Sequence, residues 1–203
     1  MPDVNSAPLP IRDTTANPAP LGLLAFGMTT VLLNIHNAGG YGMNSMILGM
    51  GLFYGGLAQV IAGVLEWKKN NTFGTTAFTS FGMFWLMLAT TIFLPNIYPE
   101  LKTDAHAMGS LMCVWGVFTL VMFVGTLRLS IALQVVFGSL VVLFGLLALG
   151  FFTGNARGVN YTQIAGYEGI FCGASAMYTG LAQVLNEVYG ATVLPLGVCR
   201  KKA

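Results

Sequence analysis

The sequence predicts an all-α membrane protein with six transmembrane helices per protomer and with both the N- and the C-terminus in the cytoplasm. Of the 203 residues, 55% are hydrophobic and 8% are charged, whereas soluble domains carry about 25% charged residues. The chain holds six apolar stretches that could each cross about 30 Å of hydrocarbon. Its basic residues also gather on one side of those stretches.

The chain is expected to divide into three parts. Residues 1–16 mix Pro, Asp, Ser and Thr without apolar periodicity and predict a flexible N-terminal tail. Residues 17–190 form the six-helix transmembrane domain, and residues 191–203 form a short basic C-terminal tail. The helices are expected over Leu21–Ala38, Ser45–Trp67, Thr75–Ile97, Met108–Leu127, Ile131–Phe152 and Ile164–Val188.

Local features support individual helices. The first opens with an Asn-Pro pair. Asn is a favoured capping residue, and Pro suits the first turn because the N–H group it lacks would have no partner there. The second and third end at Trp67 and Tyr98, aromatic residues of the kind that mark membrane interfaces. The fifth, with its run from Val135 to Phe144, is apolar nearly all round and therefore faces lipid or other helices on every side. Short connections predict a compact bundle.

The basic residues set the expected orientation. With six crossings, the loop side that includes both termini carries Arg12, Lys68, Lys69, Arg128, Arg200, Lys201 and Lys202. The opposite side carries Lys102 and Arg157. Because cytoplasmic loops hold the excess of Lys and Arg, both termini are expected in the cytoplasm of a multi-pass protein of the cell membrane.

Composition and spacing exclude several functions. Nine Lys and Arg against seven Asp and Glu leave no basic face for nucleic acid. His36 and His106 lie on different segments without metal-ligand spacing, and Cys113 and Cys172 sit in apolar helices rather than in a cationic setting. No pair of carboxylates shares a helix face. The sequence therefore predicts no enzyme, no metal and no cofactor.

The first helix carries a candidate anion site. No Lys or Arg lies inside the six stretches, so an anion would be met by amides and hydroxyls. The segment Asn17-Pro18-Ala19-Pro20-Leu21-Gly22 is expected to leave the backbone amides of Ala19, Leu21 and Gly22 free at the positive end of the helix. A plain helix cap remains the alternative explanation.

Further polar residues fall at membrane depth. Asn34, His36 and Asn37 cluster at the far end of the first helix, where they either line a solute path or are hydrated at the interface. The run from Tyr54 to Val60 is similar to the run from Tyr178 to Val184. The match is either a coincidence between packing helices or a parallel repeat that places Gln59 and Gln183 at comparable depths.

The run Asn17-Pro18-Ala19-Pro20-Leu21-Gly22-Leu23 resembles the signature of the acetate uptake transporter family, and the resemblance covers nearly everything after residue 16. Further matching runs are Met28-Thr29-Thr30, Asn34-Ile35-His36-Asn37, Phe53-Tyr54-Gly55-Gly56, Leu65-Glu66-Trp67-Lys68-Lys69, Asn71-Thr72-Phe73-Gly74, Trp115-Gly116-Val117-Phe118-Thr119-Leu120, Cys172-Gly173-Ala174-Ser175-Ala176, Leu185-Asn186-Glu187 and Thr192-Val193-Leu194-Pro195.

The resemblance implies a homo-hexamer in membrane lipid, in which each protomer has its own pore. It implies transport of acetate, of other small monocarboxylates and of succinate, either with protons as a symport or through an anion channel. It also implies an apolar gate at Phe26, Phe81 and Leu140. The family carries Tyr at the middle position, so this gate lacks a hydroxyl group.

Two other functions remain open at this stage. A pore for a small neutral solute, such as ammonia or water, fits the uncharged lining. A non-transporting membrane scaffold fits the 26 glycines, which promote close helix packing without any solute path.

Overall fold

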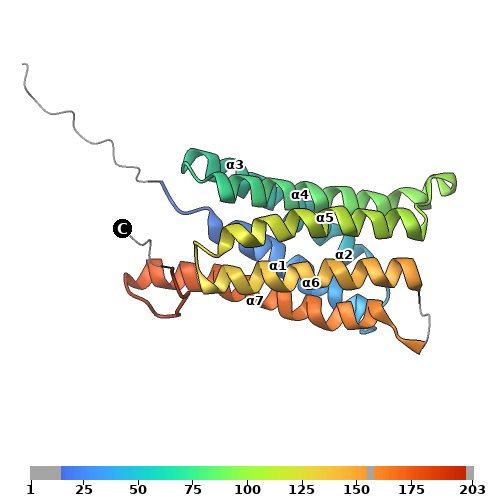
Figure 1. The fold of residues 1–203 in the computed structure, drawn as a ribbon. Helices are drawn as coiled ribbons and strands as arrows, with labels where there is room; N and C mark the ends of the chain where they lie inside the picture. Colours follow the sequence, from blue (N-terminus) through green and yellow to red (C-terminus); the bar gives the residue numbers. More distant parts are fainter. Residues whose placement is uncertain (1–14, 155–157, 200–203) are drawn as a thin grey trace, which may run out of the picture.

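The computed structural model describes residues 15–154 and 158–199, and within them it is almost entirely helical (Figure 1). The long helices run side by side along one axis. The elements in chain order are α1 (Ala19–Asn37), α2 (Ser45–Gly49), η1 (Met50–Ala58), α3 (Gln59–Lys68), α4 (Thr72–Phe93), η2 (Leu94–Asn96), η3 (Pro99–Leu101), α5 (Ala105–Thr126), α6 (Ile131–Thr153) and α7 (Tyr161–Tyr189).

Each expected apolar stretch coincides with a helical segment whose ends lie within a few residues of the prediction. Within the part of the chain that the structure describes, five segments are long and apolar enough to cross a membrane: Ala19–Asn37, Ser45–Lys68, Thr72–Asn96, Ala105–Thr126 and Ile131–Thr153. The remaining long helix, α7, has 29 residues. It packs between α1 and α6 and is less apolar than they are, because it carries more polar side chains.

The second apolar stretch is one continuous helical segment in which a π-helix lies between two α-helices. The side chain of Asn44 caps α2 by accepting hydrogen bonds from the amides of Met46 and Ile47. The nine residues of η1 then form a π-helix, in which the hydrogen bonds span five residues and the turn is wider. Gln59 is the first residue after the π-helix. The direction in which its side chain points therefore depends on the residue at which the π-helix ends.

The two described ends of the chain lie at the same end of the bundle. The side chain of Asn17 hydrogen-bonds to Gln183 near the end of α7, and Lys69 donates to the carbonyl of Thr15. Lys68, Lys69 and Arg128 are also at this end, whereas Lys102 is at the opposite end. The other basic residues in the orientation count, Arg12, Arg157, Arg200, Lys201 and Lys202, fall outside the described residues.

The residues after α7 fold back on the bundle. Gly190 ends α7 in a left-handed conformation (φ 62°). The amide of Ile131 then donates to the carbonyl of Gly197 over 2.9 Å, and the amide of Cys199 donates to the carbonyl of Leu129 over 2.9 Å. Residues 191–199 are therefore held against the turn between α5 and α6.

Glycine brings α1 and α7 into close contact. A Cβ atom on Gly173 would lie 2.6 Å from the carbonyl oxygen of Gly27, and one on Gly27 would lie 2.7 Å from that of Gly173. Backbones that approach this closely exclude any side chain between them. The contact fixes the position of α1, the helix that carries the candidate anion site.

Candidate functional site

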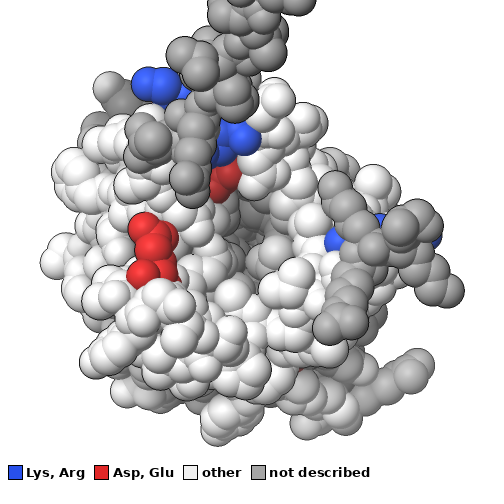
Figure 2. All heavy atoms as spheres, turned by 90° about the vertical axis from the view of Figure 1, so that its left-hand side faces the viewer, with Lys and Arg blue, Asp and Glu red and all other residues white. Residues whose placement is uncertain are grey.

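Three of the cavities between the described residues mark a path along the axis of the bundle. We call them the mouth cavity, the constriction and the far cavity. The mouth cavity, about 260 Å³, is at the end of the bundle where α1 begins, and Figure 2 faces that end and shows a central hollow with charged residues around it. Its walls are formed by Asn17, Ala19, Leu23, Glu66, Asn71, Phe73, Gly74, Ala77, Phe78, Leu129, Leu133, Phe137 and Gln183.

The start of α1 forms one wall of the mouth cavity, but most of its amides are occupied. Pro18 is the capping residue, and the Asn17 Oδ1 atom accepts the amide of Ala19 over 3.1 Å. The amide of Gly22 donates to the carbonyl of Pro18 over 3.3 Å. The expectation of free amides at Ala19 and Gly22 is therefore wrong, because the Asn-Pro pair satisfies both locally. Leu21 keeps an amide without a partner among the described residues.

Pro20 and Gly22 support this end of α1 from inside the bundle. Both residues are buried. A Cβ atom on Gly22 would lie 2.6 Å from the ring of Phe78, so only glycine allows that ring to pack on the helix. Phe78 also lines the mouth cavity and the constriction, and the run from Asn17 to Gly22 thus shapes the cavity more than it offers donors to it.

The constriction brings the three expected gate residues together. Phe26 in α1, Phe81 in α4 and Leu140 in α6 are buried and line one space of about 20 Å³, which holds about one water molecule. The rings of Phe26 and Phe81 are 5.9 Å apart. Their neighbours in the wall are Leu23, Gln59, Ala77, Phe78, Val136 and Phe137, and four of these also line the mouth cavity.

A second aromatic layer, absent from the sequence prediction, lies beyond the gate. The ring of Phe84 packs 4.9 Å from Trp115 and 5.5 Å from Phe144, edge to face. Phe84 and Phe144 follow Phe81 and Leu140 by three and four residues, which places them one helical turn further along the same faces. That spacing is the signal in the sequence that would have identified them.

The far cavity, about 460 Å³, opens at the opposite end and contains His36. The Nδ1 atom of His36 lies 2.7 Å from the carbonyl oxygen of Tyr41. Because a carbonyl only accepts, Nδ1 carries the hydrogen and Nε2 is left as an acceptor in the neutral ring. Asn37, Thr91 and Lys102 also line the cavity, and Lys102 supplies a positive charge that the sequence analysis did not assign to the path.

Asn34 lies apart from the three cavities, in the contact between α1 and α7. Its side chain is buried, donates to the carbonyl of Thr30 over 2.9 Å and accepts from Asn37 over 3.0 Å. A Cβ atom on Gly169 would lie 2.2 Å from it. Both functional groups of Asn34 are thus satisfied within helix α1, in a position where α7 packs directly against them.

Two buried polar side chains on one face of α3 have an oxygen atom without a partner. They are Gln59, at the constriction, and Glu66, at the mouth cavity. They are seven residues apart, which is about 10 Å along a helix. Gln183 lines the mouth cavity and not the constriction, so Gln59 and Gln183 lie on the same path but at different depths.

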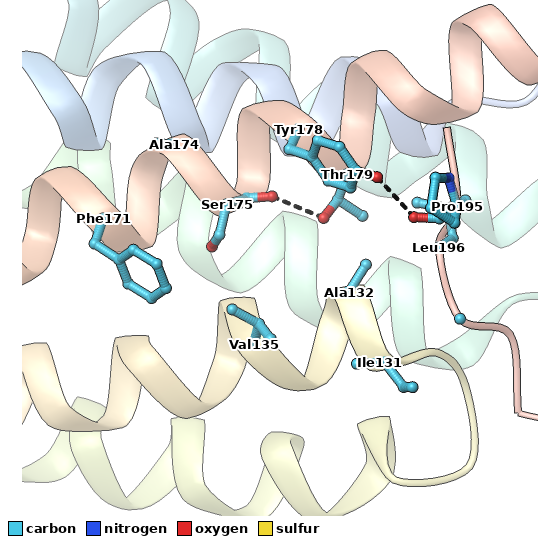
Figure 3. Close-up of a pocket in the computed structure, with 11 residues that line it drawn as sticks. Ile131, Ala132, Val135, Phe171, Ala174, Ser175, Tyr178, Thr179, Pro195 and Leu196 are labelled. Atoms are coloured by element: carbon cyan, nitrogen blue, oxygen red, sulfur yellow. Dashed lines mark hydrogen bonds between the residues drawn. The ribbon is translucent and has the colours of Figure 1, made fainter. Parts of the chain in front are cut away.

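A further groove lies between α6, α7 and the returning C-terminal segment, and the hydroxyl groups of the described residues that line it are all engaged in hydrogen bonds (Figure 3). The hydroxyl groups of Ser175 and Thr179 donate to helix carbonyls at 2.7 and 2.8 Å. The hydroxyl of Tyr178 donates to the carbonyl of Pro195 over 2.8 Å. The groove is otherwise apolar, and we assign it no part in the path.

Comparisons with known proteins match nearly the whole chain. The sequence profile of the GPR1/FUN34/yaaH family matches residues 2–197. The succinate-acetate/proton symporter SatP of Escherichia coli K12 is 54% identical over 182 residues, which are 90% of this chain and 95% of that protein. An uncharacterized protein of Methanothermobacter thermautotrophicus is 54% identical over 192 residues, which are 91% of this chain and 93% of that protein. The solved structure of the bacterial acetate channel SatP has a TM-score of 0.85 and 53% identity, covering 91% of this chain and 100% of that one.

Proposed function

Because this chain belongs to the GPR1/FUN34/yaaH family, we propose that it is a multi-pass permease of the cell membrane for acetate and other small carboxylates, including succinate. The resemblance to acetate transporters is confirmed, since the similar proteins are named a succinate-acetate/proton symporter and an acetate channel. We infer that the chain is a transporter and not an enzyme, because the similar proteins are named a symporter and a channel.

The observation that carries the proposal is an apolar constriction between two cavities with polar walls. Amide side chains of Asn17, Asn71 and Gln183 lie at the mouth cavity, and His36 and Lys102 lie at the far cavity. Between them, Phe26, Phe81 and Leu140 close the path. A bare anion loses its hydration at such a place at high cost, so the barrier selects for solutes that are small or that cross without charge.

The architecture of the permease follows from the same premise. We infer that α7 is a sixth membrane crossing, because it is long enough and packs between two helices that are apolar enough to cross. An even number of crossings would put both termini on one side, and the excess of basic residues in the sequence on that side supports a cytoplasmic location. We further infer a hexamer in which residues 17–190 of each protomer form one complete pore.

Within that pore we assign roles by position. Asn17, Pro18, Ala19, Pro20, Leu21 and Gly22 form the cytoplasmic mouth, Gln59 offers an oxygen and an amide beside the gate, and His36 is at the far entrance. Asn34 contributes by fixing α1 against α7. The gate itself consists of Phe26, Phe81 and Leu140, without a hydroxyl group.

Flux of labelled acetate into proteoliposomes, measured with and without a pH gradient, tests the proposal. A permease raises the flux above that of protein-free vesicles, and coupling to protons raises it further when the lumen is alkaline. Water or ammonia flux without acetate flux would instead show a pore for a neutral solute. The absence of all three fluxes, from protein that is folded and inserted, would leave only a scaffold.

A further inference from the structure

Among the described residues, Glu66 has the one ionisable side chain in the wall of the mouth cavity. It lies at the end of α3 and is only 2% exposed. A buried carboxylate beside the route of an anion is costly twice, because burial removes its hydration and the anion repels it. No part of the transport path described so far uses this carboxyl group.

The hydrogen bonds around Glu66 assign a different role to each carboxyl oxygen. The Oδ1 atom of Asn71 accepts the amide of Gly74 over 3.0 Å, because Asn71 caps helix α4. This fixes the orientation of the Asn71 amide, so that its Nδ2 atom must donate, and it does so to Oε2 of Glu66 over 2.6 Å. Oε2 is therefore an acceptor, and the proton of a neutral Glu66 belongs on Oε1.

Oε1 is buried and has no partner among the described residues. A Cβ atom on Gly74 would lie 2.7 Å from Oε2, so a glycine at this position lets α4 press against the carboxyl group and limits its movement. The protonated group keeps one O–H donor for which the protein provides no acceptor. The carboxylate of an anion in the mouth cavity can accept a hydrogen bond from this O–H group, and its negative charge strengthens that bond.

Among the described residues that line this route, Glu66 is the one acid. Lys69, less than one turn along the chain, donates to the carbonyl of Thr15. The cavity walls from α1, α4, α6 and α7 contribute only amide and apolar side chains. Lys68, Arg128 and Glu187 lie at the same end of the bundle and are exposed.

We propose that Glu66 transfers a proton to the entering carboxylate. The Glu66 carboxylate first binds a proton at Oε1, and the neutral acid then donates that hydrogen to an oxygen of acetate. Transfer breaks the O–H bond on Glu66 and forms one on acetate, which leaves the Glu66 carboxylate and neutral acetic acid. Both are alkyl carboxylic acids of similar intrinsic acidity, so neither direction is strongly uphill.

This step explains how a carboxylate passes an apolar gate. Acetic acid carries no charge past Phe26, Phe81 and Leu140, and Gln59 can pair with its carboxyl group beside them. One proton and one acetate then cross together, and Glu66 binds the next proton. The inference rests on the proposed function and adds the residue at which proton and solute meet.

The test is the pH profile of protein-mediated acetate flux, with equal pH on both sides and the flux of protein-free vesicles subtracted. Glu66→Gln keeps the size of the side chain and removes the exchangeable proton. In this variant the flux should be proportional to the concentration of neutral acetic acid in solution, which decreases about a hundredfold between pH 5 and pH 7. The flux of the wild-type protein should decrease far less over that range. At pH 5 the two proteins should show the same flux.

Two further variants sharpen the result. Glu66→Asp retains a carboxyl group and should recover most of the flux at pH 7. Glu168→Gln is the matched control, because Glu168 is also a carboxylate with an unpartnered buried oxygen but lines none of the three cavities, and its profile should equal that of the unmodified protein. A profile of Glu66→Gln that is unchanged, or lower by one factor at every pH, overturns the inference.

Chemical labelling addresses the unmodified protein if Glu66→Gln does not insert. A hydrophobic carbodiimide reacts with protonated carboxyl groups, so it should modify Glu66 and abolish flux at pH 7, and acetate should slow the reaction. Mass spectrometry of the peptide that contains Glu66 reports the modification. A peptide that stays unmodified, or a modification that acetate does not slow, overturns the inference. If wild-type protein that has not been treated with carbodiimide shows no acetate flux, the proposed function itself is refuted.

Discussion

The Nδ2 atom of Asn17 donates a hydrogen bond to Oε1 of Gln183 over 3.0 Å and so joins the start of α1 to the end of α7, 166 residues away. The same Asn17 side chain accepts the amide of Ala19. One asparagine thus holds the entry segment in place and connects two walls of the mouth cavity.

Replacement of Asn17 by alanine should reduce acetate flux severalfold, because the mouth cavity loses both bonds. The lost cap should cost only about 0.5–2 kcal/mol of stability, so the protein should still fold. Flux in proteoliposomes at matched protein levels measures the effect. Gln183→Leu, which removes the interhelical bond and keeps the cap, is the control. Unaltered flux in Asn17→Ala would reduce the segment to a structural cap.

Leu140→Ala should widen the gate and admit larger acids such as lactate. Phe81→Tyr nearly conserves shape and adds a hydroxyl group, so it should alter the ratio of acetate to succinate flux without a loss of folded protein. Competition of unlabelled acids against labelled acetate measures both. If the three residues only pack, Leu140→Ala should instead cost about 2–5 kcal/mol and give no new substrate.

Exposed cysteines at the two ends of the bundle should label from opposite sides of the membrane. Arg128 and Lys102 are both exposed, and they lie at opposite ends of the bundle, Arg128 at the end proposed to face the cytoplasm. In a background of Cys113→Ser and Cys199→Ser, Lys102→Cys should react with an impermeant thiol reagent in intact cells. Arg128→Cys should react only after permeabilisation. The reverse pattern would invert the proposed orientation.

Gly173→Ala should destabilise the protein by about 1–3 kcal/mol, because the new methyl group meets the backbone of Gly27 and neither helix can yield without moving the other. Gly145→Ala is the matched control, since a Cβ atom there has no neighbour within 4 Å and alanine favours the helix. The midpoint of thermal unfolding in detergent measures the stability of both variants. Equal midpoints for Gly173→Ala and Gly145→Ala would argue against a close α1–α7 contact.

The helices could be predicted from the sequence because a membrane sets their length and apolar character. The meeting of Phe26, Phe81 and Leu140 was expected only through the family resemblance, since periodicity alone does not say which helix faces which. The occupied amides of Ala19 and Gly22 were missed because a capping side chain and a preceding carbonyl compete for the same donors. Spacing on the sequence does not reveal that competition.

Other features had no usable signal. The π-helix over Met50–Ala58 has an ordinary apolar, glycine-rich composition, and it packs against α1 and α4. The burial of Glu66 has no signal in the sequence, because it depends on Asn71 and Gly74 across a turn. That turn passes through Asn70 in a left-handed conformation (φ 59°), which a sequence pattern does not specify.

The small volume of the constriction has a consequence for the energy supply of the cell. A proton moves quickly along an unbroken file of hydrogen-bonded water, and such a file through a permease would discharge the gradient that drives ATP synthesis. A space for about one water molecule among Phe26, Phe81 and Leu140 interrupts the file, because a water there has few polar partners. With the proposed gate closed in this way, we expect the membrane to stay insulating while the permease is idle, and a proton to cross only as part of a solute molecule.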